Sequence, residues 1–202
     1  MNVILSPERI DLQECDVLVT GFFSDEKPLK GSSGWIDWRL NGILSRSLIE
    51  KRLTGGWKET TLIPSQGRIV PRMMLLIGLG NVKEYSYLRV RELSFHLLET
   101  LKKLNTSNIC FSLPYAEHYN VDCGKLAEVL IEEIADCVDR NQSSSHKEWI
   151  DGLRLFFAEG EERFPEILLG VQTAKSILEN RLKIRIFAPS EKNSETIISA
   201  QI

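Results

Sequence analysis

One candidate ligand-binding loop is Gly78-Leu79-Gly80-Asn81, which follows an apolar run and precedes a helical pattern by a few residues. Glycines at such a place let the backbone turn sharply and come close to a ligand, and the N-terminus of the next helix attracts anions. The pattern lacks the third glycine of a dinucleotide-binding fingerprint. A purely structural turn is therefore the alternative interpretation.

A second candidate loop covers residues 114–120, Pro-Tyr-Ala-Glu-His-Tyr-Asn. Its tyrosines could stack on a base or ring and its histidine lies where functional groups gather, although Glu117 would oppose a phosphate. Ligands of open α/β sheets bind outside the carboxyl ends of the strands, so both loops could face one crevice. Packing of surface loops is the alternative. The candidate crevice residues are Gly21, Gly78, Gly80, Asn81, Pro114, Tyr115 and His118.

The remaining reactive side chains do not indicate a metal site or a catalytic nucleophile. The three histidines share no metal-ligand spacing, and no two cysteines are two or three residues apart. We predict reduced, structural thiols, with a Cys123–His118 nucleophilic pair as the alternative. The acidic run at Glu159, Glu161 and Glu162 is explained by a helix dipole. We therefore predict no catalytic residue, no metal site and no cofactor.

The elements that must position these loops alternate between strands and helices. Apolar and β-branched runs predict strands, and apolar residues at helical spacing predict helices. The strands are expected at residues 3–5, 15–20, 59–63, 72–79, 107–113, 153–158 and, as an edge strand, 183–188; the helices at 35–53, 85–104, 124–139 and 163–179. This order predicts an α/β sandwich with a mixed, largely parallel central sheet. We expect one domain over residues 1–188, a polar loop at 141–145 and a polar tail at 189–202.

Composition excludes several classes of protein. The chain has 202 residues, of which 43% are hydrophobic and 26% charged, so it is neither collagenous, coiled-coil nor wholly disordered. The net charge of −3 does not suit a protein that coats phosphate backbones. Residues 117–166 carry 13 acidic and 5 basic side chains, which are either solvated helix faces or a surface for a basic partner. Without a signal-peptide pattern or an apolar run of about 20 residues, we expect a cytoplasmic protein that does not contact membranes.

Three stretches, taken in order, resemble the N-terminal domain of the leucyl aminopeptidase (cytosol aminopeptidase) family. The first is an aspartate-plus-valine run that leads to a Phe-x-Asp turn, and the second includes an Ile-Asp pair and a Gly-Gly-Trp-Lys segment. The third is the run Met-Leu-Leu-Ile-Gly-Leu-Gly. They lie at residues 16–25, 29–58 and 74–80. The similarity covers residues 1–115 well and residues 116–188 by element order alone.

The resemblance implies a macro-domain-like, three-layer α/β/α sandwich. The family's metal-dependent chemistry resides in a separate C-terminal domain, whose signature Asn-Thr-Asp-Ala-Glu-Gly-Arg does not occur here. We therefore expect a stand-alone, non-catalytic module with a binding or regulatory role, exerted through self-association or docking to another protein.

The resemblance also leaves alternative functions open. One is binding of ADP-ribose or another nucleotide in the crevice, although this chain has Tyr-Ala-Glu-His where macro domains carry a glycine-rich, hydroxyl-bearing phosphate loop. The others are the regulatory part of a split metallo-aminopeptidase and a DNA-contacting module. The acidic block at residues 117–166 argues against contact with nucleic acid.

Overall fold

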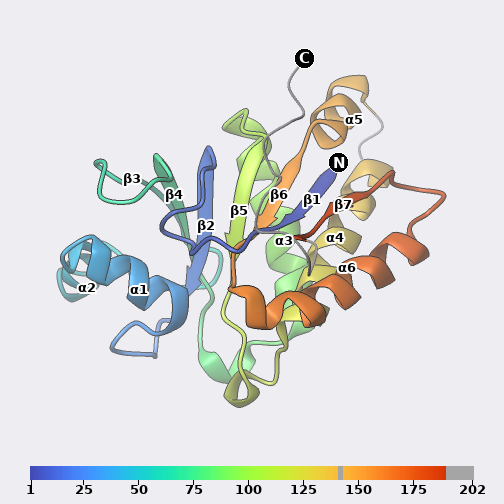
Figure 1. Ribbon diagram of the computed structural model, residues 1–202. Helices are drawn as coiled ribbons and strands as arrows, with labels where there is room; N and C mark the ends of the chain where they lie inside the picture. The colour runs from blue at the N-terminus through green and yellow to red at the C-terminus, as the bar shows by residue number, and fades with distance from the viewer. Residues whose placement is uncertain (141–142, 190–202) are drawn as a thin grey trace.

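The computed structural model describes residues 1–140 and 143–189 and contains one seven-stranded sheet (Figure 1). The strand order is β3-β4-β2-β5-β6-β1-β7. Only β3 and β4 pair antiparallel, and every other pair of neighbours is parallel. The strands are β1 (Asn2–Leu5), β2 (Val17–Phe22), β3 (Thr60–Pro64), β4 (Met73–Gly78), β5 (Asn108–Ser112), β6 (Arg154–Phe157) and β7 (Arg185–Phe187).

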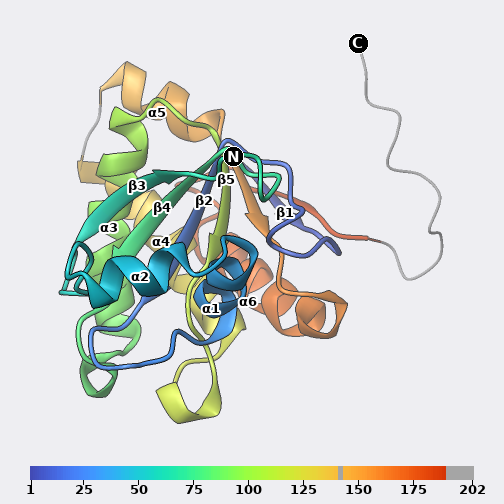
Figure 2. The ribbon, with the colours of Figure 1, turned by 90° about the vertical axis from the view of Figure 1, so that its left-hand side faces the viewer.

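Helices cover both faces of the sheet. In Figures 1 and 2, α1 (Gly31–Arg39) and α2 (Ile43–Ile49) lie on one side. The other side is covered by α3 (Tyr87–Lys103), α4 (Cys123–Arg140) and α6 (Phe164–Ile177), while α5 (Ser144–Asp151) contacts α4. Single-turn helices lie at Val82–Glu84, Glu117–Tyr119 and Glu161–Arg163. The predicted three-layer sandwich with a mixed, mostly parallel sheet is confirmed.

The central strands are apolar along their whole length because both of their faces are covered. In β2, Val17 and Val19 join the larger core beneath α3, α4 and α6, whereas Leu18 joins the smaller core beneath α1 and α2. In β4, Leu75 and Met74 divide in the same way. The sheet therefore forms part of both cores.

Two helical segments differ from the prediction. The single helix expected at residues 35–53 is divided into α1 and α2 by Asn41 and Gly42, whose φ angles of 56° and 73° no right-handed helix accommodates. Part of the predicted polar loop at 141–145 lies outside the described residues, and α5 begins within it, at Ser144. The residues of the predicted tail from 190 onward also lie outside them.

The strands expected at residues 59–63 and 72–79 form an antiparallel hairpin, and the predicted edge strand is confirmed. Strands β3 and β4 pair antiparallel from Thr60 opposite Ile77 to Pro64 opposite Met73. Strand β7 lies at the far end of the sheet, where charged side chains suit an edge. Among the described residues, no helix combines the length and the apolar composition that crossing a membrane requires.

Candidate functional site

A crevice of about 350 Å³ lies at the carboxyl ends of β2, β5 and β6. The sheet order places β2 beside β5 and β5 beside β6, so the segments that follow these strands converge at one end of the sheet. The start of α1 closes the crevice on one side. Its lining consists of Thr20, Gly21, residues 30–33, residues 112–116, His118, Tyr119 and Glu159.

The N-terminus of α1 contributes backbone donors to the crevice. The first helical residues are Gly31, Ser32 and Ser33, and all three line the crevice. No side chain of the described residues caps this terminus. The first N–H groups of a helix have no partner within the helix and carry the positive end of its dipole. This wall of the crevice is therefore suited to an anion.

Buried hydroxyl groups line the floor of the crevice. Thr20 and Ser112 are register partners on β2 and β5, so their side chains lie on the same face of the sheet. Thr20 is fully buried, and its Oγ1 has no hydrogen-bond partner among the described residues. A hydrogen bond joins Ser112 Oγ to Ser32 Oγ. Because an unpaired buried hydroxyl is costly, Thr20 marks a position where a ligand group or water would be stabilised.

Glu159 places a carboxyl group in the same crevice. Its side chain keeps some accessible surface, but surrounding protein removes most water from the carboxyl group, and this desolvation raises the pKa of Glu159 to about 7. Hydrogen bonds from Ser112 and Tyr115 and the charge of Arg163 oppose the rise. The Tyr115 hydroxyl donates to Glu159 Oε2 over 3.1 Å. The carboxyl group thus changes its charge near neutral pH.

Charged and aromatic groups form the mouth of the crevice. Lys30 Nζ lies 3.0 Å from Glu26 Oε1, and the Tyr119 hydroxyl donates to both Glu26 oxygens over 2.8 and 2.9 Å. The exposed ring of His118 contacts the ring of Tyr119, with centroids 3.9 Å apart. Glu26 therefore holds a cation and a ring at the mouth in a defined arrangement.

The structure gathers four of the seven predicted residues around this crevice. Gly21 lies in the fully buried strand β2, and a Cβ atom there would approach Leu79 Cδ1 to 2.8 Å. Pro114, Tyr115 and His118 line the crevice from the segment after β5. Their contact with a ligand stays a prediction.

Gly78, Gly80 and Asn81 lie outside the lining of the crevice, where their loop packs against neighbouring backbone segments. A Cβ atom on Gly78 would lie 2.0 Å from Gly56 O, so only glycine allows this contact. Gly80 N donates to Gly55 O over 2.9 Å. Asn81 Oδ1 accepts from the Ser24 hydroxyl over 3.3 Å. In the described residues, this loop holds neighbouring loops together, and any ligand contact of its own stays a prediction.

The sequence interpretation missed the most polar part of the crevice. Thr20 reads as an ordinary strand residue, and Ser32 and Ser33 belong to a loop that precedes the expected helix. Glu159 reads as one of several acids at a helix start, but Gly160, with φ of 84°, separates it from the helical turn that begins at Glu161. A usable signal existed, because Glu159 comes two residues after a buried strand, at its carboxyl end.

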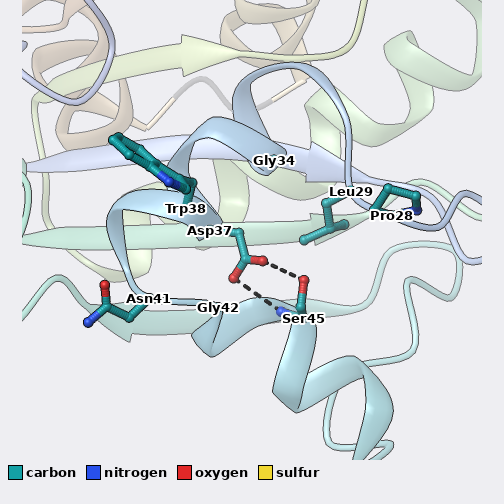
Figure 3. A pocket seen from close by; sticks show the side chains of 8 residues that line it. All are labelled: Pro28, Leu29, Gly34, Asp37, Trp38, Asn41, Gly42 and Ser45. Atoms are coloured by element: carbon teal, nitrogen blue, oxygen red, sulfur yellow. Dashed lines mark hydrogen bonds between the residues drawn. The ribbon is translucent and has the colours of Figure 1, made fainter.

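A second hollow of about 400 Å³ lies between α1 and α2 (Figure 3). Asp37 dominates it, and its carboxylate accepts hydrogen bonds from the backbone N–H groups of Leu44 and Ser45 over 2.8 and 3.1 Å and from the Ser45 hydroxyl. These bonds cap the N-terminus of α2. The Asp37 carboxylate therefore already has its hydrogen-bond partners within the fold, in contrast to the Thr20 hydroxyl in the crevice.

The described cysteines are all free and buried, in agreement with structural thiols. Burial, with a smaller contribution from Glu166, raises the pKa of the Cys123 thiol to about 12. A thiol that stays protonated is a poor nucleophile, which disfavours the Cys123–His118 alternative. In residues 1–140 and 143–189, no group of three or more histidines, cysteines and acids could hold a metal ion.

Six of the 13 acids in the acidic block form ion pairs within the described residues. On α4, Glu132 and Asp136 contact Arg91, and Glu133 Oε1 lies 2.7 Å from Arg140 Nη1. Arg181 bridges Asp136 and Asp139. These acids are balanced by neighbouring basic side chains, and a surface for a basic partner stays a prediction.

Known proteins resemble the chain in both sequence and fold. The probable cytosol aminopeptidase of Sulfurihydrogenibium sp. (strain YO3AOP1) is 24% identical over 122 residues, which are 60% of this chain and 24% of that protein. The chain spans about a quarter of the length of the curated relatives it matches. The Oceanobacillus iheyensis macrodomain with ADP superimposes with a TM-score of 0.63 at 14% identity, over 87% of this chain and 91% of that one.

A mutant of tomato leucine aminopeptidase superimposes with a TM-score of 0.56 at 16% identity, over 88% of this chain and 37% of that one. The structural likenesses show a shared macrodomain-type fold. The family model described as "Cytosol aminopeptidase family, N-terminal domain" matches residues 19–137, more than half of the chain. The chain therefore belongs to the N-terminal domain family of the cytosol aminopeptidases.

Proposed function

We propose that the domain is a non-catalytic binding module and that the crevice at the ends of β2, β5 and β6 is its ligand-binding site. The observation that carries the proposal is the fully buried Thr20 hydroxyl, which lines the crevice without a hydrogen-bond partner among the described residues. The uncapped start of α1 and the carboxyl group of Glu159 support it. We propose a regulatory role exerted through self-association or docking to another protein. The relatives' name, cytosol aminopeptidase, supports the predicted cytoplasmic location.

Amide NMR titrations test the crevice. We expect that at least one small molecule from a panel of nucleotides, sugar phosphates and amino acids shifts the amide signals of Thr20, Ser32 and Ser112. Thr20→Val, which keeps the shape and removes the hydroxyl, should weaken that ligand by about fivefold, the value of one neutral hydrogen bond. Thr61→Val on the edge strand β3 is the matched control. A panel that leaves these amides unmoved contradicts the proposal.

A peptidase assay tests the non-catalytic part of the proposal. The pure protein, supplied with manganese or zinc, is expected to leave leucine 4-nitroanilide intact. Robust turnover that co-purifies with the protein through successive columns would contradict that part.

Nucleotide binding is the second candidate, because the Oceanobacillus iheyensis macrodomain with ADP shares the fold. The uncapped start of α1 suits a phosphate, but Glu159 opposes one whenever it is ionised. Calorimetry with ADP-ribose tests this candidate. A dissociation constant below about 100 μM, or about −5.5 kcal/mol, would favour the nucleotide.

A further inference from the structure

We propose that the crevice binds an α-amino acid with an apolar side chain, its carboxylate at the start of α1 and its ammonium group at Glu159. This inference rests on the proposed function and names the chemical class of the ligand. It follows from the observation that one end of this small cavity favours an anion and the other end favours a cation.

The start of α1 is the end that prefers an anion. Gly31, Ser32 and Ser33 present the unpaired first N–H groups of a nine-residue helix, while the charge of neighbouring Lys30 is paired with Glu26. Gly31 leaves its surroundings open, since a Cβ atom there would meet nothing within 4 Å. The unpartnered, fully buried hydroxyl of Thr20 is an independent sign of a ligand in the same cavity. A carboxylate accepts from N–H and O–H donors of this kind.

Glu159 is the end that prefers a cation. Its Oε2 accepts one hydrogen bond from Tyr115, which leaves lone pairs on the carboxylate for further donors. An ammonium group has three donors and supplies the positive charge that a desolvated carboxylate lacks. Arg163 lies over the Tyr115 ring at 5.5 Å and pairs with Glu166, so it does not neutralise Glu159 directly.

The separation of the two ends fits a small zwitterion. Ser32, at the start of α1, is joined to Ser112 by a hydrogen bond, and the Ser112 hydroxyl is near enough to Glu159 to oppose the rise of its pKa. The two ends are thus both neighbours of one serine side chain, Ser112. A ligand that bridges them needs an anionic and a cationic group a few bonds apart, as in an α-amino acid.

The rest of the lining favours an apolar side chain and a small ligand. Leu113, Pro114 and Ala116 provide an apolar wall beside the charged ends. The volume of about 350 Å³ is at the small end of ligand pockets, which run from about 300 to 1,000 Å³. The crevice therefore suits a single amino acid better than a dinucleotide.

Calorimetry and amide NMR on the full chain test the inference with valine, leucine, methionine and phenylalanine as free L-amino acids. We expect at least one to bind and to shift the amides of Ser32 and Ser112. For that amino acid, the N-acetyl derivative removes the ammonium group and the amide derivative removes the carboxylate. Each derivative should bind at least tenfold more weakly, the effect of losing one charge-assisted hydrogen bond.

Glu159→Gln assigns the ammonium end. It should weaken the free amino acid at least tenfold and leave the affinity of the N-acetyl derivative unchanged, a difference that a merely structural defect would not produce. Glu92→Gln, on the exposed face of α3, is the matched control and should change neither affinity.

The outcomes separate this inference from the proposed function. If another small molecule shifts the crevice amides and none of the four amino acids does, the amino-acid assignment is overturned and the proposed function stands. The same holds if an amino acid and its two derivatives bind equally. If no compound shifts these amides, both are overturned.

Discussion

At the scale of single residues, folding and ligand binding have opposite effects on the charge of Glu159. The fold surrounds its carboxyl group with protein and so disfavours the charge that a cationic ligand would need. The charged and titratable groups near it are Tyr115, Arg163 and the Cys110 and Cys123 thiols. Among them, only Arg163 carries a charge near neutral pH that favours the carboxylate. Binding sites frequently hold an ionisable group whose charged form is disfavoured by its surroundings.

The first prediction at this scale concerns stability against pH. The folded pKa of Glu159, about 7, exceeds the ordinary value of 4.5. The stabilising effect of the bound proton is therefore complete below about pH 4.5 and is lost as the pH rises through 7. Glu159→Gln, which cannot ionise, should be more stable than the wild type by as much as ~3 kcal/mol at pH 8 and by less than about 1 kcal/mol at pH 5. Urea denaturation at the two pH values measures this.

The control for this prediction is His118→Gln, because His118 is another ionisable side chain that lines the same crevice. His118→Gln should keep the pH dependence of the wild type. A stability difference between Glu159→Gln and wild type that is equal at pH 5 and pH 8 would show that the carboxyl group ionises normally.

At the scale of elements, close helix contacts fix the geometry behind the crevice. Helices α4 and α6 cross through Gly124 and Gly170, where a Cβ atom on Gly170 would lie 2.0 Å from Gly124 O. The start of α4 is also held by Glu166 Oε1, which accepts from Cys123 N over 3.1 Å. Since the segment from Pro114 to Tyr119 leads into α4, this crossing positions one wall of the crevice.

The close contact between α4 and α6 predicts how one added methyl group at Gly170 changes stability. Gly170→Ala gains about 1 kcal/mol of helix propensity, but the methyl group would meet backbone atoms that cannot move independently. Overpacking of this kind costs about 1–3 kcal/mol, so we expect a net loss of stability despite the better helix former. Thermal or urea denaturation measures the change. Gly152→Ala is the control, because its nearest neighbours lie at an ordinary 3.5 Å; a stabilised Gly170→Ala would contradict the close crossing.

The element order could be predicted from the sequence because each element carries its own period. Amphipathic α4 and the buried strands β2 and β4 are recognised by residues within a single window. The break between α1 and α2 depends instead on Asp37, which caps a helix seven residues away, and on two left-handed residues between them. A helical period alone does not reveal such a cap.

The crevice was predicted only in its outline, for a related reason. The rule that ligands bind at the carboxyl ends of parallel strands located Tyr115 and His118, but it also favoured the Gly78 loop, which lies outside the lining. The significance of Thr20 arises only from pairing of β2 with β5, which brings it beside Ser112, 92 positions along the chain. Similarly, the role of Glu159 depends on β6 lying next to β5. These are consequences of strand order, which local patterns do not specify.

At the scale of the whole molecule, the sheet joins two cores of unequal size. The larger contains α3, α4 and α6 and the smaller contains α1 and α2, and the same strands supply both through alternate side chains. Loss of the sheet therefore removes support from both layers at once. This arrangement is the physical basis for the prediction that residues 1–188 form one domain, and it can be tested by following each layer separately.

Two tryptophans report on the two layers. Trp35 lies on α1 and donates through Nε1 to buried Asp11 over 3.1 Å, whereas Trp149 lies on α5 and donates to Thr106 O over 2.8 Å. Two variants, each retaining one of these tryptophans with the other tryptophans replaced by phenylalanine, are denatured with urea. Because the sheet is shared, the fluorescence midpoint of each variant should coincide with its own midpoint by circular dichroism. A Trp35 transition at lower urea than the loss of secondary structure would mean that α1 and α2 separate before the sheet unfolds. In that case the start of α1 would be a movable wall of the crevice, and ligand binding at the crevice would raise the Trp35 midpoint more than the Trp149 midpoint.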